Sequence, residues 1–244
     1  MYKRADGIIF SMEGGRDYIR EKGWDTYMDI NKFHYINNGV DLSTFYQSVK
    51  DNELDDQDLN SEQIFKVVYT GSIRVANNLQ PVVEAAKILK DKGYDKIHIF
   101  AYGDGDDRES LENYCKANDL KTVHFKGFVE KKYIPFILSK SDLTILNYKN
   151  AKTLRFGGSQ NKLFEYMAAG KPVLVTVNMN YNVVTKNNCG IALEEPSAEN
   201  IANAIIQIYD MSDEEHSAWG VSAKKSAEEY DFKALTDKLL RIIL

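Results

Sequence analysis

The sequence lacks the features of membrane, disulfide-rich and metal-binding proteins. No apolar run approaches the ~18–20 residues of a membrane span, and the first residues do not resemble a signal peptide. Only two cysteines are present, Cys115 and Cys189, which are too few and too irregular for a disulfide framework or a zinc site. The four histidines show no ligand spacing. We therefore expect a cytoplasmic protein without a transmembrane segment, with reduced cysteines and with no bound metal.

The sequence also lacks an excess of basic residues. Its 31 Lys and Arg are outnumbered by 36 Asp and Glu, which gives a net charge of −5. Nucleic-acid binding needs a basic face, so we expect no nucleic-acid partner. At 244 residues, with 43% apolar content, the chain is long and apolar enough for a substantial core.

From residue 66 onward, short β-branched runs alternate with helical patterns, which is typical of an α/β fold with a parallel sheet. The expected strands are 66–70, 96–101, 122–126, 143–146, 172–175 and 190–193. The expected helices are 79–92, 107–118, 131–139, 161–169, 198–209, 212–229 and 231–243. This order predicts a Rossmann-like six-stranded parallel sheet with helices on both faces.

The segment 156–173 is the most informative motif. Gly157 and Gly158 precede a short helix, and glycines there allow a ligand to approach the backbone closely. The free N–H groups of a helix N-terminus suit a diphosphate. Glu165, about one turn further on, could accept both hydroxyls of a ribose. An ordinary buried helix with a carboxylate near its start has the same pattern, so both readings stand at this point.

Three loops after expected strands should meet the same crevice, because the strands of a parallel sheet end at one edge. They contain Gly71 with Ser72 and Arg74, then Gly103, then Gly127-Phe128-Val129. Gly103 and Gly105 also suggest a dinucleotide fingerprint, but Arg108 stands where its third glycine is required. The incomplete fingerprint therefore argues against an NAD-dependent dehydrogenase.

The form Ser-x-Asn-Lys-Leu-Phe-Glu-Tyr-Met-Ala-Ala-Gly-Lys-Pro at 159–172 resembles the donor-binding motif of retaining glycosyltransferases of family 4, which have the two-domain GT-B fold. The variant is similar to a subgroup that builds bacterial capsule and O-antigen polysaccharides. In the family two glutamates flank seven residues, and the second holds the ribose. Glu165 matches the second, whereas the first falls on Gly157. The variant keeps Lys162 near the phosphates.

The resemblance implies a site without metal or cofactor, in which Lys162 and Glu165 act on a UDP- or GDP-linked sugar. Ser72 and Asn77 occupy positions where many members have an arginine and a lysine, so Arg74 and Lys162 are our candidates for diphosphate charge. The remaining donor-binding candidates are Gly71, Ser72, Gly103, Phe128, Val129, Gly157, Gly158, Ser159 and Asn161.

The resemblance also divides the chain. Residues 1–45 resemble the end of an N-terminal acceptor domain with its Asn-Gly-Val-Asp linker. Residues 46–62 resemble an acidic, mobile connector. Residues 63–244 resemble the nucleotide-sugar-binding domain with its C-terminal helices. Two Rossmann domains need roughly 350 residues. We therefore expect a missing N-terminal domain or a partner chain, and apolar surface that is covered by intramolecular packing or by self-association.

The resulting hypothesis is the donor-binding half of a retaining, metal-independent glycosyltransferase in surface polysaccharide synthesis, inactive as an isolated chain. Its acceptor would be a glycan or a lipid-linked glycan, at the inner face of the membrane. A second hypothesis is a non-catalytic or split nucleotide-binding module that needs a partner polypeptide. A third is a sugar-nucleotide epimerase, for which we identify no acidic and histidine residues in the cleft.

Overall fold

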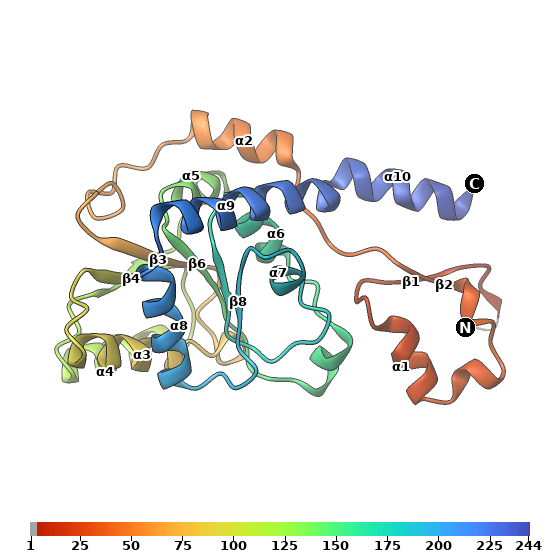
Figure 1. The fold of residues 1–244 in the computed structure, drawn as a ribbon, viewed down its shortest axis with the longest axis horizontal. Helices are drawn as coiled ribbons and strands as arrows, with labels where there is room; N and C mark the ends of the chain where they lie inside the picture. Colours follow the sequence, from red (N-terminus) through yellow and green to blue (C-terminus); the bar gives the residue numbers. More distant parts are fainter. Residues whose placement is uncertain (1–3) are drawn as a thin grey trace.

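The computed structural model describes residues 4–244, and a six-stranded parallel sheet forms its larger part (Figure 1). The strands lie in the order β5-β4-β3-β6-β7-β8. They are β3 (Phe65–Thr70), β4 (Ile97–Tyr102), β5 (Val123–Gly127), β6 (Leu143–Leu146), β7 (Val173–Val175) and β8 (Gly190–Ala192). The chain reverses its direction of travel across the sheet between β3 and β6, and such a switch point opens a crevice at the carboxyl ends of the strands. The predicted fold class is confirmed.

Helices cover both faces of this sheet because its strands are apolar on both sides. Val67 and Ile145 belong to a core that includes α3 (Gln80–Asp91) and α8 (Ala198–Tyr209). Val68 and Leu146 belong to the opposite core. That core includes α5 (Ile134–Ser139), α6 (Asn161–Ala168), α7 (Val183–Lys186) and α9 (Asp213–Ala227). Helix α4 is Arg108–Ala117.

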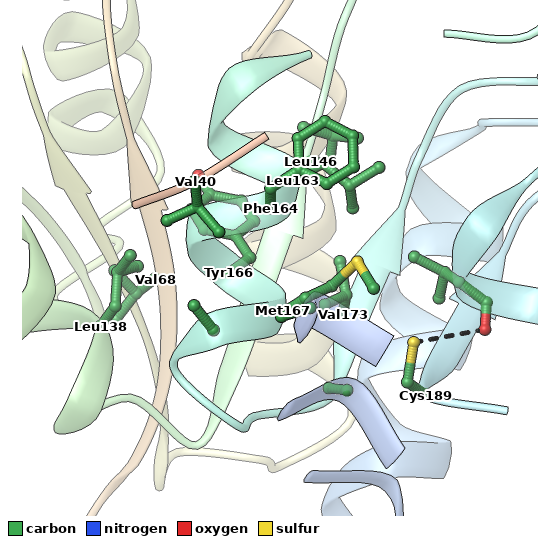
Figure 2. Packing of buried hydrophobic residues seen from close by; sticks show 14 of the residues in the cluster. Val40, Val68, Leu138, Leu146, Leu163, Phe164, Tyr166, Met167, Val173 and Cys189 are labelled. Carbon is green, nitrogen blue, oxygen red and sulfur yellow. Dashed lines mark hydrogen bonds between the residues drawn. The ribbon is translucent and has the colours of Figure 1, made fainter. Parts of the chain in front are cut away.

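Helix α6 is held firmly in the second core. Figure 2 shows its residues Leu163, Phe164 and Met167 among the side chains of the sheet, and all three are almost completely buried. The predicted helix at 131–139 begins instead as a 3-10 turn, Lys131–Tyr133. Pro135 lies in the first turn of α5, where its missing N–H breaks no helical hydrogen bond.

The smaller part precedes residue 40. It contains the parallel strands β1 (Ile8–Phe10) and β2 (Phe33–Tyr35) and helix α1 (Gly15–Glu21). Short 3-10 turns at Trp24–Thr26 and Ile30–Lys32 connect α1 to β2. The final helix, α10 (Phe232–Ile243), runs out from the large sheet toward β1 and β2, so the C-terminus lies on this side (Figure 1).

The acidic segment differs from the expected connector. Residues Leu42–Asp51 form helix α2, which the sequence analysis did not predict. Beyond it, Leu59 is completely buried, and the Asp56 carboxylate accepts hydrogen bonds from Tyr102 and from Lys126. The segment is therefore packed against the large sheet, because Leu54 and Leu59 join the core that contains α6 and because its carboxylates find partners on β4 and β5.

Candidate donor pocket

A pocket of about 490 Å³ lies at the carboxyl end of β3, beside the first turns of α6. Five of the predicted site residues line it: Gly71, Ser159, Asn161, Lys162 and Glu165. Lys162 and Glu165 are three positions apart on one helix, so their side chains share a face. The pocket thus brings together the glycine loop after β3, a lysine and a carboxylate. We call it the donor pocket below.

The loops after β3, β4 and β5 interlock next to this pocket. The Gly71 N–H donates to the Tyr102 carbonyl at 2.9 Å, and the Gly103 N–H donates to the Gly127 carbonyl at 2.8 Å. A Cβ at Gly103 would lie 1.8 Å from the Gly71 carbonyl oxygen, so only glycine fits there. The expected convergence of these loops is therefore present, and close backbone contact is what requires Gly103.

Lys162 projects between two aromatic rings. Its ammonium lies 4.4 Å from the centroid of the Tyr69 ring and 5.1 Å from that of Tyr148, and it donates to the Tyr69 hydroxyl at 3.1 Å. Tyr69 in turn donates to the Ser72 carbonyl at 2.8 Å. Burial lowers the pKa of Lys162 to about 8, and the Glu165 carboxylate opposes this shift. The cation is thus poorly hydrated, which favours an anionic ligand.

The lysine also stands directly over the glycine loop, since a Cβ at Gly71 would lie 2.6 Å from its ammonium. Glu165 pairs with Lys131 at 3.3 Å, and the Glu165 side chain is 20% exposed whereas that of Lys131 is 85% exposed. A ligand hydroxyl could therefore reach the carboxylate by displacing an exposed lysine. The arrangement offers a cation for phosphate and an acceptor for hydroxyls.

The buried hydroxyl of Tyr166 fixes α6 relative to β3. It accepts the Thr70 N–H at 3.0 Å and lies 3.3 Å from the Thr70 hydroxyl. At the other end of the pocket, the Asn38 N–H donates to the Ser159 hydroxyl at 3.0 Å, and its side-chain amide donates to the Ser159 carbonyl at 2.7 Å. These contacts hold the loop before α6 against the segment that follows β2.

Other predicted residues lie outside the pocket lining. Arg74 and Ser72 are exposed in the turn after β3, and the Ser72 hydroxyl donates to Asn77 at 3.3 Å. Phe128 is 77% exposed, and Val129 packs against the core that contains α6. Gly103, Gly157 and Gly158 shape neighbouring loops without lining the pocket.

The pocket also includes residues that the sequence analysis did not single out, namely Asn38, Thr70, Lys131, Ile134 and Tyr148. Tyr148 follows the carboxyl end of β6, so the switch-point rule that selected the other loops could have found it. Across residues 4–244, no group of three His, Cys, Asp or Glu side chains could hold a metal ion. Within the same range, no helix is long and apolar enough to cross a membrane.

Comparison with known proteins identifies one family. Residues 50–226 match the family model described as "Glycosyl transferases group 1". No curated protein matches the sequence.

Solved structures share the fold at low sequence identity. HepE from Anabaena, solved in complex with UDP and glucose, is 15% identical with a TM-score of 0.73, and the match covers 98% of this chain and 63% of that chain. A glycosyltransferase from Rickettsia africae is 15% identical with a TM-score of 0.76, covering 99% and 64%. WaaG, a glycosyltransferase involved in lipopolysaccharide biosynthesis, is 19% identical with a TM-score of 0.65, covering 96% and 62%. This chain therefore spans less than two thirds of each of these three proteins.

Proposed function

The chain belongs to the group 1 glycosyl transferases, and from this premise we propose that its donor pocket binds a nucleoside diphosphate sugar for transfer to a glycan. The observation that carries the proposal is the placement of Lys162 and Glu165 on one face of α6, above the Gly71 loop. The HepE structure, which contains UDP and glucose, supports a uridine donor.

In this proposal Lys162 contacts the diphosphate and Glu165 accepts the ribose hydroxyls. The C1–O bond to the diphosphate breaks as the acceptor oxygen bonds C1 on the same face, and the acceptor proton passes to the leaving phosphate oxygen. Charge builds up on that phosphate, where a preorganised cation stabilises the transition state. The enzyme would thus be retaining and independent of metal, as in glycosyltransferases of family 4.

We place the reaction in the assembly of a surface polysaccharide such as a capsule or O-antigen, at the inner face of the membrane. The support is the resemblance of the α6 motif to that subgroup. We further propose that efficient transfer needs a second domain or a partner chain, since an oriented pair of reactants can lower the barrier by ~7–11 kcal/mol. Coverage of less than two thirds of HepE and of WaaG supports this requirement.

A second candidate function is a nucleotide-binding module without transfer activity. Gly157, where the resemblance places a sugar-binding glutamate, favours it. An acceptor assay distinguishes the two functions. It measures sugar transfer from a radiolabelled nucleotide sugar to extracted lipid acceptors, with and without a candidate partner chain. Transfer in either arm supports the transferase, and binding without transfer in both supports the module.

Titration with UDP, GDP and ADP tests the donor pocket itself. We expect at least one of them to bind at submillimolar concentration, and the amide resonances of Gly71, Lys162 and Glu165 to move. Millimolar or weaker binding of all three, or perturbations confined to other loops, would refute the proposal.

A further inference from the structure

A second cavity, of about 400 Å³, lies between the β1–β2 pair and α10. Its floor is apolar and comes from the strands and from the helix: Phe10, Phe33, Tyr35 and Ile242. Phe10 and Phe33 are stacked, with ring centroids 5.8 Å apart. Three cationic side chains, Arg16, Lys238 and Arg241, line the same space, and we call it the basic cavity.

Among the described residues, these cations lack acidic partners. Arg16 is exposed, and its Nε–H donates to the Phe33 carbonyl at 3.0 Å. The Lys238 ammonium lies 4.9 Å from the centroid of the Tyr35 ring. Arg241 follows it by three positions, on the same face of α10. Within residues 4–244, none of the three cations forms an ion pair with a carboxylate.

The one carboxylate in the lining is already engaged, since Glu13 pairs with Lys186 at 3.5 Å. The imidazole side chain of His34 also lines the cavity. The cavity therefore has a surplus of positive charge on a chain whose net charge is −5. Like charges gathered without counter-ions repel each other, and an anion bound among them would relieve this repulsion.

The basic cavity adjoins the donor pocket. The Tyr35 hydroxyl at its edge accepts a hydrogen bond from Nδ2 of Asn37 at 2.6 Å, and the side-chain oxygen Oδ1 of Asn37 accepts one from the Ser159 hydroxyl. Ser159 lines the donor pocket. On the other side, the Glu13 nitrogen lies 3.6 Å from the position of a Cβ on Gly157. A ligand in the cavity would thus lie one side chain away from the loop that precedes α6.

We propose that the basic cavity binds an organic phosphate, with its phosphate among Arg16, Lys238 and Arg241 and its apolar part on the Phe10 ring and the Ile242 side chain. Guanidinium groups suit phosphate because they can donate two parallel hydrogen bonds. The proximity to Ser159 assigns this ligand as the acceptor, or part of it; that assignment rests on the proposed function, whereas the binding itself does not.

The experiment uses the chain in the presence of saturating UDP, which occupies the donor pocket, with geranyl phosphate, inorganic phosphate and geraniol as probes. We expect geranyl phosphate to bind at least about tenfold more tightly than either fragment, because it uses both the cations and the floor. The ring protons of His34 should move as it binds. The affinity should fall between about 50 and about 200 mM salt, since the three cations are exposed and exposed charges are screened.

The variant K238Q/R241Q should lose at least about tenfold in affinity for geranyl phosphate, whereas the control K233Q, on an exposed lysine of the same helix, should not. UDP affinity should stay unchanged in both. Equal affinity of inorganic phosphate or of geraniol would overturn the assignment, and so would an unchanged affinity in the double variant. The salt dependence of the wild-type chain tests the same charge recognition if the double variant folds poorly.

Vesicles that contain phosphatidic acid are added as competitors of geranyl phosphate, to test whether the bound phosphate belongs to a lipid headgroup or to a soluble ester. Displacement of geranyl phosphate assigns a lipid headgroup, and its retention assigns a soluble ester. A chain that binds geranyl phosphate but no nucleotide would refute the proposed function and leave the basic cavity standing. A chain that binds nucleotide but no geranyl phosphate would refute only the ligand proposed for the basic cavity.

Discussion

Replacing Lys162 by methionine should stabilise the folded chain while weakening diphosphate binding. Because burial lowers the pKa of Lys162 to about 8 from a usual value of 10.5, holding its charge in the fold at pH 7 costs about 3 kcal/mol. The contacts of the ammonium with the Tyr69 and Tyr148 rings stabilise this charge by about 0.5–1 kcal/mol each. The variant should therefore gain about 1–2 kcal/mol in the free energy of unfolding.

Nucleotide affinity should change in the opposite direction. Hydrogen bonds to a charged group contribute about 1.5–3 kcal/mol, so Lys162→Met should weaken UDP about 10- to 150-fold and leave uridine nearly unchanged. Calorimetric titration and denaturant unfolding measure the two effects, with Lys149→Met, on an exposed lysine after Tyr148, as the matched control. Equal losses for UDP and uridine would show that Lys162 does not contact phosphate.

The pH dependence of the wild-type chain checks the same reasoning. Between pH 8 and 10.5 the folded chain has released the Lys162 proton while the unfolded chain still holds it. The unfolded state then binds more protons, so the stability contributed by this group rises with pH across this window. UDP affinity should fall over the same range as the cation is lost. A UDP affinity that does not change between pH 7 and about 9.5 would contradict the assignment.

Three further predictions concern other positions. Glu165→Gln should weaken UDP by about 1.5–3 kcal/mol, and the loss should vanish with a dideoxyribose analogue; a loss that persists with the analogue would exclude ribose binding. Gly103→Ala should lower the free energy of unfolding by about 1–3 kcal/mol, since its Cβ would collide with the Gly71 carbonyl; an unchanged melting temperature would contradict the interlocked loops. His98 and His124 stack with nitrogens 2.9 Å apart, and burial lowers the pKa of both. Their contribution to stability should be complete above pH 6.5 and lost as the pH falls, and His124→Gln should flatten that decline in an acid unfolding series.

The sheet could be predicted because its apolar runs and helical patterns alternate regularly from β3 to α8. Helix α2 was missed although its signals are present. Asp41 caps it by accepting the Thr44 N–H, and Leu42 and Phe45 are buried at helical spacing. The run of acidic residues after this helix suggested a solvated connector, whereas tertiary contacts through Leu59 fix the segment in place.

The donor pocket could be predicted only where local periodicity determines it. Lys162 and Glu165 share a face because α6 is a helix, and Gly71 follows the strand at the switch point. Asn38 could not be found in this way, because it meets Ser159 across 121 positions of the chain. Arg74 was expected in the pocket, but Ile73 is fully buried and its N–H donates to the Asp104 carbonyl, which leaves the next side chain exposed.

The backbone conformation at Gly157 disfavours the glutamate that the resemblance places there. Its φ of +96° is one that residues with a side chain rarely adopt, and its N–H donates to the Leu154 carbonyl at 2.9 Å. The nearest atoms to an added Cβ are 3.5 Å away, so space alone would admit a larger residue. The glycine is therefore required by the turn before α6, and a glutamate could return only if that turn changed. Any contact to the donor sugar at this point must come from backbone groups or from a facing segment, and Glu13, whose nitrogen lies 3.6 Å from the same position, belongs to that segment.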